Sequence, residues 1–124
     1  MPHLTLEYTG NIKQEIDSEA VFSHLHQILA TTGGIKIDNC KSRAVRMEDY
    51  FIARGGPAKA FVHLEIHFLE GRSEKIKQAI GKESLEVLKA YFASSIEKLD
   101  LQINVEITEI RRSAYHKFPS GTLK

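Results

Sequence analysis

The chain has 124 residues, of which 42% are hydrophobic and 27% are charged, and its formal net charge is only +1. This length predicts one domain, residues 1–124, and the small net charge disfavours nucleic-acid binding by bulk electrostatics. Apolar runs are too short for a membrane span, and no secretory signal is expected at the N-terminus. The composition therefore predicts a small soluble, cytoplasmic protein without nucleic-acid or membrane partners.

An internal repeat relates two halves of the chain, about 1–60 and 61–124. Residues 2–8 and 62–68 both alternate apolar and polar side chains, and both carry His-Leu at their second and third positions. The apolar residues are Leu4, Leu6 and Tyr8 in the first segment and Val62, Leu64, Ile66 and Phe68 in the second. Such alternation predicts two strands that each bury one face against helices.

In the first half, a helix and a second strand follow the first strand. Asp17 or Ser18 is predicted to cap the helix, and Gly33 and Gly34 are predicted to end it. The apolar stripe of this helix consists of Val21, Leu25, Ile28 and Leu29. A strand from Cys40 to about residue 49 is predicted to close this half.

A Gly-Gly-Pro turn at 55–57 leads into the second half, which repeats the plan. Ser73 is predicted to cap a longer helix that runs to about residue 95, and a strand from Gln102 to Ile110 follows. The apolar stripe of this helix consists of Ile76, Ile80, Val87, Leu88 and Tyr91. The tail around 117–121 is expected to be irregular.

Two tandem β-α-β units predict an α+β fold, with one four-stranded mixed sheet and two helices on one face. The helices are expected to cover the face lined by Leu4, Leu6, Leu64 and Ile66. The opposite face would carry His3, Thr5, Glu7, His63, Glu65 and His67. This second face is either solvated or buried in an oligomer, and the pattern alone does not choose between the two.

Pro2 directly follows the initiator methionine. If Met1 is removed, Pro2 carries a free secondary amine, and α-amino groups titrate at about 7.7–8.0. Burial or nearby cations would lower this pKa further and produce a neutral base suited to general acid–base catalysis. The alternative is chance, because proline is common as the first residue of a strand.

Basic residues supply candidate anion-binding groups. Lys41 and Arg43 lie about 6.5–7 Å apart on the same side of the predicted strand, a spacing suited to a small substrate with more than one carboxylate. The alternative for this pair is a solvated charge cluster. Arg72 lies between Gly71 and Ser73 where a strand joins a helix, so it could help bind an anion at the helix N-terminus. The alternative there is a turn glycine followed by a capping serine.

No metal or cofactor site is predicted. His24 and His26 point to different sides of a helix, while His63 and His67 are separated by about 13 Å of extended chain. Cys40 is the one cysteine, so it forms no intrachain disulfide, and buried packing is its expected role. Phosphate-binding, dinucleotide-binding and Ser-His-Asp patterns are absent from the sequence.

Four short motifs occur in order along this doubled plan: Met-Pro-His at 1–3, Lys-Ser-Arg at 41–43, Ala-Phe-Val-His at 60–63 and Gly-Arg-Ser at 71–73. Together they resemble the 5-carboxymethyl-2-hydroxymuconate isomerase family of the tautomerase superfamily. The resemblance covers nearly the whole chain. It implies a cofactor-free keto–enol isomerase of aromatic compound catabolism, assembled as a homotrimer with its polar sheet face turned inward.

The resemblance also implies roles for single residues. Pro2, exposed by removal of Met1, matches the catalytic base of the family. Lys41 and Arg43 match basic residues that bind or polarise the substrate, and Arg72 matches a further family arginine. Lys41 departs from the arginine of the family pattern, and lysine provides a point charge rather than a planar fork. The implied substrate is a small unsaturated di- or tricarboxylate.

Two alternatives stay open at the level of sequence. One is a non-enzymatic ferredoxin-like binding or assembly module, in which Pro2 is incidental. The other is a different reaction within the tautomerase superfamily. A monomer without tautomerase activity would favour the first, and substrate screening would identify the second.

Overall fold

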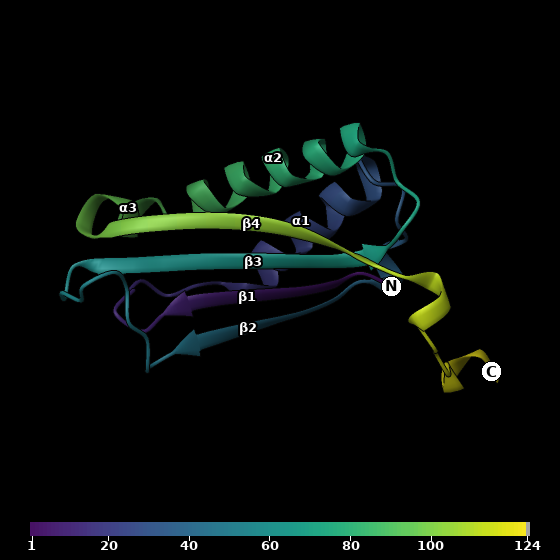
Figure 1. The fold of residues 1–124 in the computed structure, drawn as a ribbon, viewed down its shortest axis with the longest axis horizontal. Helices are drawn as coiled ribbons and strands as arrows, with labels where there is room; N and C mark the ends of the chain where they lie inside the picture. Colours follow the sequence, from purple (N-terminus) through teal and green to yellow (C-terminus); the bar gives the residue numbers. More distant parts are fainter. Residues whose placement is uncertain (124) are drawn as a thin grey trace.

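The computed structural model describes residues 1–123, which form a four-stranded mixed sheet with helices on one face (Figure 1). The strands are β1 (His3–Thr9), β2 (Lys41–Met47), β3 (Lys59–Leu69) and β4 (Asp100–Ile110), in the order β2-β1-β3-β4. β1 runs parallel to β2 and antiparallel to β3, and β3 runs parallel to β4. The predicted union of two β-α-β units in one sheet is confirmed.

The two long helices are α1 (Ser18–Thr31) and α2 (Glu74–Tyr91), and both lie over the same face of the sheet (Figure 1). Asp17 and Ser73 cap them, because each side chain accepts the backbone N–H three residues ahead, at 3.1 and 3.2 Å. Gly34 follows the end of α1 with φ 67°, a conformation that glycine adopts without strain. Within residues 1–123, no helix is long and apolar enough to cross a membrane.

The second helix ends earlier than predicted. α2 stops at Tyr91 rather than near residue 95, and a separate short helix, α3 (Ala93–Lys98), follows it. Phe92 at the junction has φ −100° and ψ 17°, is fully buried, and lies 6.3 Å from the ring of Tyr8. Burial of a phenylalanine side chain stabilises by about 1.5–3 kcal/mol, so the buried ring favours this junction.

The second strand is also shorter than the predicted segment of residues 40–49. Cys40 lies before β2, where its N–H closes a 3₁₀ turn (Ile37–Asn39) by donating to the carbonyl oxygen of Ile37 at 2.9 Å. At the other end, β2 stops at Met47, and Arg46 forms an ion pair with Glu48 at 3.1 Å. The central part of the prediction, including both basic residues, is confirmed as strand.

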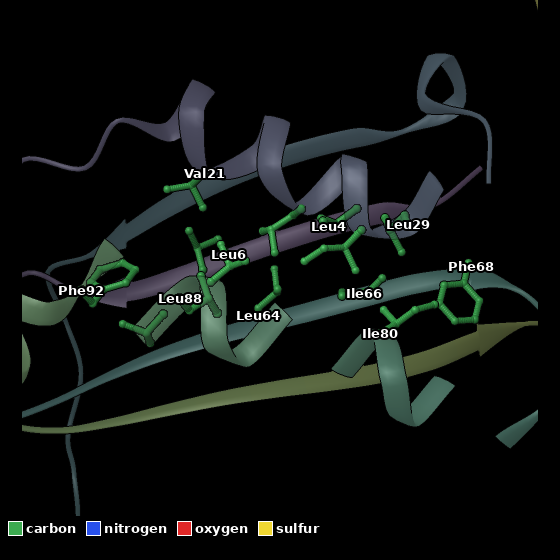
Figure 2. Packing of buried hydrophobic residues seen from close by; sticks show 14 of the residues in the cluster. Leu4, Leu6, Val21, Leu29, Leu64, Ile66, Phe68, Ile80, Leu88 and Phe92 are labelled. Atoms are coloured by element: carbon green, nitrogen blue, oxygen red, sulfur yellow. The ribbon is translucent and has the colours of Figure 1, made fainter. Parts of the chain in front are cut away.

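The hydrophobic core lies between the helices and the sheet (Figure 2). Six of the predicted inward residues of the two central strands are at most 1% exposed: Leu4, Leu6, Val62, Leu64, Ile66 and Phe68. The seventh, Tyr8, is only half-buried and packs against the core. The helices contribute Val21, Leu25, Leu29, Ile80 and Leu88. Because side chains alternate along a strand, burial of this set fixes the opposite set on the other face of the sheet.

We call that other face the open face. Its central rows are formed by His3, Thr5 and Glu7 of β1, Lys41, Arg43 and Val45 of β2, His63, Glu65 and His67 of β3, and Asn104, Glu106 and Thr108 of β4. His67 lies 3.0 Å from Glu65, and His63 lies 3.2 Å from Glu106. Interaction with His67 lowers the pKa of Glu65. The predicted polar face is therefore confirmed, with acid–histidine pairs at its centre.

The N-terminal segment and the start of the tail lie at the same end of the sheet, where β1 begins and where β3 and β4 end (Figure 1). After β4, the tail contains 3₁₀ turns at Arg112–Ala114 and Ser120–Leu123. Residues 117–119 are irregular as predicted, whereas the predicted irregular segment ends in the second of these turns. The N–H of Glu70 still donates to the carbonyl oxygen of Ile110 at 3.0 Å, so the start of the tail is held against the loop after β3. The N-terminus, the loop after β3 and the start of the tail therefore lie together at one end of the sheet.

Candidate active site

The end of the sheet where β1 begins holds a cavity of about 260 Å³. The N-terminus, the turn after α1, the loop after β3 and the start of the tail meet there. The wall residues that matter for its chemistry are Met1, Pro2, Lys36, Phe68, Arg72 and Arg112. The cavity therefore brings together two of the predicted site residues, Pro2 and Arg72.

Pro2 is buried in the cavity wall, directly before β1. Its carbonyl oxygen accepts the backbone N–H of Lys41 at 3.1 Å, so pairing with the start of β2 fixes its main chain. The adjacent amine of Met1 has a pKa below its ordinary value. Burial and then the positive charges of Lys117, Lys41 and Arg72 disfavour its protonated form.

Arg72 reaches the cavity from the loop between β3 and α2. Its Nε donates to the carbonyl oxygen of Gly33 at 2.7 Å, and its Cζ lies 5.5 Å from the ring centre of Phe68. Phe68 is buried in the core, so both contacts hold the guanidinium in place. The two terminal nitrogens form the side of the fork that can face a carboxylate.

The other two predicted substrate-binding residues lie outside the cavity wall, on the open face. Lys41 Nζ is 3.5 Å from the carbonyl oxygen of Asn39, which is a wall residue, so Lys41 lies at the edge of the cavity. Both terminal nitrogens of Arg43 lie 3.4 Å from His3 Nδ1. Burial and then the charge of Arg43 lower the pKa of His3. Within one chain, Lys41 therefore lies next to Pro2, whereas the guanidinium of Arg43 contacts His3 on the open face.

Sequence reasoning missed two cationic wall residues, Lys36 and Arg112. Lys36 follows the glycines that end α1, and Arg112 begins the tail, so neither lies in a periodic segment. The signal that could have found Arg112 is strand adjacency. Parallel pairing places Ile110 beside Leu69, and the residues just after these two strand ends therefore meet.

All charged side chains of the cavity wall are cations, namely Lys36, Arg72 and Arg112, and no Asp or Glu of residues 1–123 lines it. None of these three forms an ion pair with any part of the chain that the structure describes. A partly enclosed site of one charge concentrates ions of the opposite charge. The cavity is therefore suited to hold a small anion beside Pro2.

Cys40 is not arranged as a nucleophile. Its Sγ lies 3.7 Å from the carbonyl oxygen of Lys36, and partial burial raises the pKa of the thiol, which disfavours the reactive thiolate. Its side chain is half-buried rather than fully buried. Among residues 1–123, no group of three or more His, Cys, Asp and Glu side chains is placed to hold a metal ion.

The sequence model of 5-carboxymethyl-2-hydroxymuconate isomerases matches residues 2–119 of this chain. The chain belongs to the 5-carboxymethyl-2-hydroxymuconate isomerase family. It is 31% identical over 110 residues to the 5-carboxymethyl-2-hydroxymuconate Delta-isomerase of Escherichia coli, a match that covers 89% of this chain and 87% of the relative. The predicted resemblance is confirmed, and the protein is an enzyme of the isomerase class. The alternative of a non-enzymatic module is therefore set aside.

Solved structures agree with membership of this isomerase family. A crystal structure of a 5-carboxymethyl-2-hydroxymuconate isomerase from Deinococcus radiodurans R1 superposes with a TM-score of 0.85 at 33% identity, covering 94% of this chain and 88% of that one. A fused 4-OT, described as a symmetric trimer, superposes with a TM-score of 0.72 at 13% identity over 93% of this chain and 90% of its own. The second match shows the fold alone. The tautomerase-like α+β fold is confirmed.

Proposed function

We propose that this isomerase converts the enol form of a small unsaturated di- or tricarboxylate into its keto form, with Pro2 as general base once Met1 is removed. The observation that carries the proposal is the burial of Pro2 in the wall of a cavity whose charged side chains are all cations. The Escherichia coli relative is named for a muconate that carries three carboxylates. A related product of aromatic catabolism is the proposed substrate here.

The proposed reaction moves one proton and involves no net redox change. The neutral nitrogen of Pro2 removes the proton from the enol oxygen, the conjugated double bonds shift as the C=O forms, and the same proton is delivered to a carbon further along the system. The base must be neutral at working pH. Burial and the charges that lower the pKa of the Met1 amine would surround the Pro2 amine as well.

Cations of the cavity would bind the substrate and stabilise its developing negative charge. Arg72 is held by Gly33 and Phe68, so its terminal nitrogens are fixed before substrate arrives. Lys41, at the cavity edge, is proposed as a second contact to the oxyanion or a carboxylate. Arg43 is proposed to act at a site that a neighbouring subunit completes, because its side chain lies on the open face.

We also propose that the enzyme is a homotrimer in which the open face is turned inward. The open-face side chains of the two central strands, β1 and β3, are half-buried already, and Glu65 and Glu106 are paired with histidines. Burial of ionisable groups is tolerated when they are paired. Two solved structures of the same fold are described as trimers of fused 4-OT.

The direct test compares the protein lacking Met1 with its Pro2→Ala variant. The assay follows the ultraviolet absorbance of 2-hydroxymuconate, with phenylenolpyruvate as a second substrate. Loss of a general base is expected to reduce kcat by about 10²–10⁴-fold. Intact mass and circular dichroism confirm processing and folding of both proteins. Equal rates for the two proteins would contradict the role of Pro2, and a wider substrate panel would then identify another superfamily reaction.

A further inference from the structure

Arg112 is a cavity cation to which the family resemblance assigns no role. Its Nη2 donates to the carbonyl oxygen of Glu70 at 3.1 Å and lies 3.6 Å from the position that a Cβ would take on Gly71. Gly71 directly precedes Arg72 in the chain. Two guanidinium groups therefore reach one cavity from adjacent points of its rim, one from the loop after β3 and one from the tail after β4.

The position of Arg112 is fixed by its own main chain as well as by its side chain. Its backbone N–H donates to Glu70 Oε2 at 2.9 Å, so this carboxylate holds the main chain of Arg112. Within residues 1–123 the guanidinium forms no ion pair. A cation that is already anchored, with N–H groups left for a ligand, needs little reordering when it binds an anion.

Lys36 adds a third charge to the same cavity. It follows Gly33, whose carbonyl oxygen anchors Arg72, by three positions in the turn after α1. Three like charges around about 260 Å³ repel one another, and a bound anion relieves that repulsion. Because one guanidinium fork matches one carboxylate, the set has capacity for two carboxylates.

We propose that Arg112 and Lys36 form a second carboxylate-binding subsite beside Arg72, and that Arg112 gives the enzyme its preference for dicarboxylates and tricarboxylates over monocarboxylates. This inference rests on the proposed function, which places the reaction at Pro2 in the same cavity. Arg112 is thus a specificity residue of the tail rather than a group that moves the proton.

The kinetic test uses Arg112→Gln and the matched control Arg111→Gln, which neutralises the neighbouring exposed arginine outside the cavity wall. For the dicarboxylate 2-hydroxymuconate, Arg112→Gln is expected to raise KM by about 10- to 100-fold, the range for a lost hydrogen bond to a charged group. For the monocarboxylate phenylenolpyruvate, the change in KM is expected to be less than about 3-fold. Arg112→Lys is expected to restore part of the preference, since it keeps the charge without the fork.

A binding test separates the subsite from the proposed reaction. Muconate and sorbate are dienes of equal length with two and one carboxylates, and neither carries the enolic hydroxyl that isomerisation requires. Calorimetric titration of the protein lacking Met1 is expected to show muconate weakened about 10-fold or more by Arg112→Gln and sorbate unchanged. If the wild type isomerises neither 2-hydroxymuconate nor phenylenolpyruvate but still shows this difference between muconate and sorbate, the proposed function fails and the subsite stands.

Three results would overturn the subsite: equal weakening of muconate and sorbate, no weakening of muconate, or the same effect from Arg111→Gln. Thermal unfolding of each variant checks that the fold is intact. If Arg112→Gln lowers Tm, Lys36→Gln provides the same comparison of muconate with sorbate from a different segment, and no difference there counts against the proposal.

Discussion

At the scale of single residues, the environment of the N-terminal amine is set by charges from distant parts of the sequence. Lys117, Lys41 and Arg72 all lower the pKa of the Met1 amine, in addition to burial. A base is active when neutral, so a lowered pKa extends activity to lower pH. After removal of Met1, the same charges from the tail, the start of β2 and the loop after β3 would act on the amine of Pro2.

The first prediction concerns Lys117, which lies outside the cavity wall. Activity should rise with pH through the pKa of the Pro2 amine, with a midpoint below that of an ordinary α-amino group. Lys117→Gln removes a charge that lowers this pKa, so the midpoint of the kcat/KM profile should move to higher pH. Lys98→Gln, at the far end of the sheet in α3, is the control and should leave the midpoint unchanged. An identical profile for the two variants would contradict this assignment.

At the scale of elements, periodicity predicted both long helices and three of the strands, the repeat of the β-α-β plan predicted β2, and local exceptions account for the errors. Alternation from Leu4 to Phe68 predicted the buried face of the two central strands because burial on one side imposes a period of two. The break at Phe92 could not be predicted, because its ring is positioned by contact with Tyr8, which lies 84 residues earlier in the chain. The residues of the candidate active site that sequence analysis missed are likewise positioned by contacts between distant parts of the chain.

Pro2 and Arg72 were found because each lies in a recognisable local motif, at the start of a strand and before a helix cap. Lys36 and Arg112 were not found because they follow the ends of a helix and a strand, where no period operates. The position of Arg112 in the cavity depends on the pairing of β3 with β4, and that of Lys36 depends on the path of the turn after α1. No short segment of the sequence predicts which distant segments will meet in this way.

The second prediction concerns the break between α2 and α3. Phe92→Ala should lower the free energy of unfolding by about 3–5 kcal/mol, because it leaves a cavity beside Tyr8. Denaturant unfolding measures this loss. Ile96→Ala is the control from the neighbouring helix, and its 43% exposed side chain should cost less than about 1 kcal/mol. Similar losses for both variants would contradict the role given to Phe92.

The third prediction concerns the contact between α1 and β2. His26 Nε2 lies 2.6 Å from Ser42 Oγ, and burial lowers the pKa of His26. Since the folded pKa lies below the unfolded value of about 6.5, the unfolded state takes up the proton first as pH falls, and stability is lost there. The stability advantage of wild type over His26→Gln should therefore be larger at pH 8 than at pH 5.

Denaturant unfolding at the two pH values tests the role of His26. His116→Gln, in the exposed tail, serves as the control and should show no such change between pH 8 and pH 5. An advantage of wild type over His26→Gln that grows toward acid would contradict the assigned direction.

At the scale of the whole molecule, the two faces of the sheet have different roles. One face is covered by α1 and α2, whereas the open face carries paired ionisable groups and the exposed Val45. The proposed trimer would bury this face and bring Arg43 toward a neighbouring subunit. The functional unit would then be larger than one chain.

The fourth prediction tests this assembly. Val45 and Ile96 are both 43% exposed, but Val45 lies on the open face and Ile96 lies in α3 on the opposite side of the sheet. Val45→Asp should shift the protein from trimer to monomer, because Val45 is paired with Glu7 and a carboxylate there would place two like charges side by side on a buried face. Ile96→Asp should remain trimeric. Light scattering of both variants checks the result, and a monomeric wild type would contradict the trimer.

Met1 forms part of the cavity wall, and this has a consequence for how the enzyme comes into being. A single aminopeptidase cut would both create the secondary amine of Pro2 and clear space that the substrate occupies. If Pro2 is the general base, the chain that retains Met1 is an inactive precursor, and this one cut activates it. Specific activity should scale with the processed fraction measured by intact mass, and an affinity tag fused ahead of Pro2 should abolish activity without unfolding the protein.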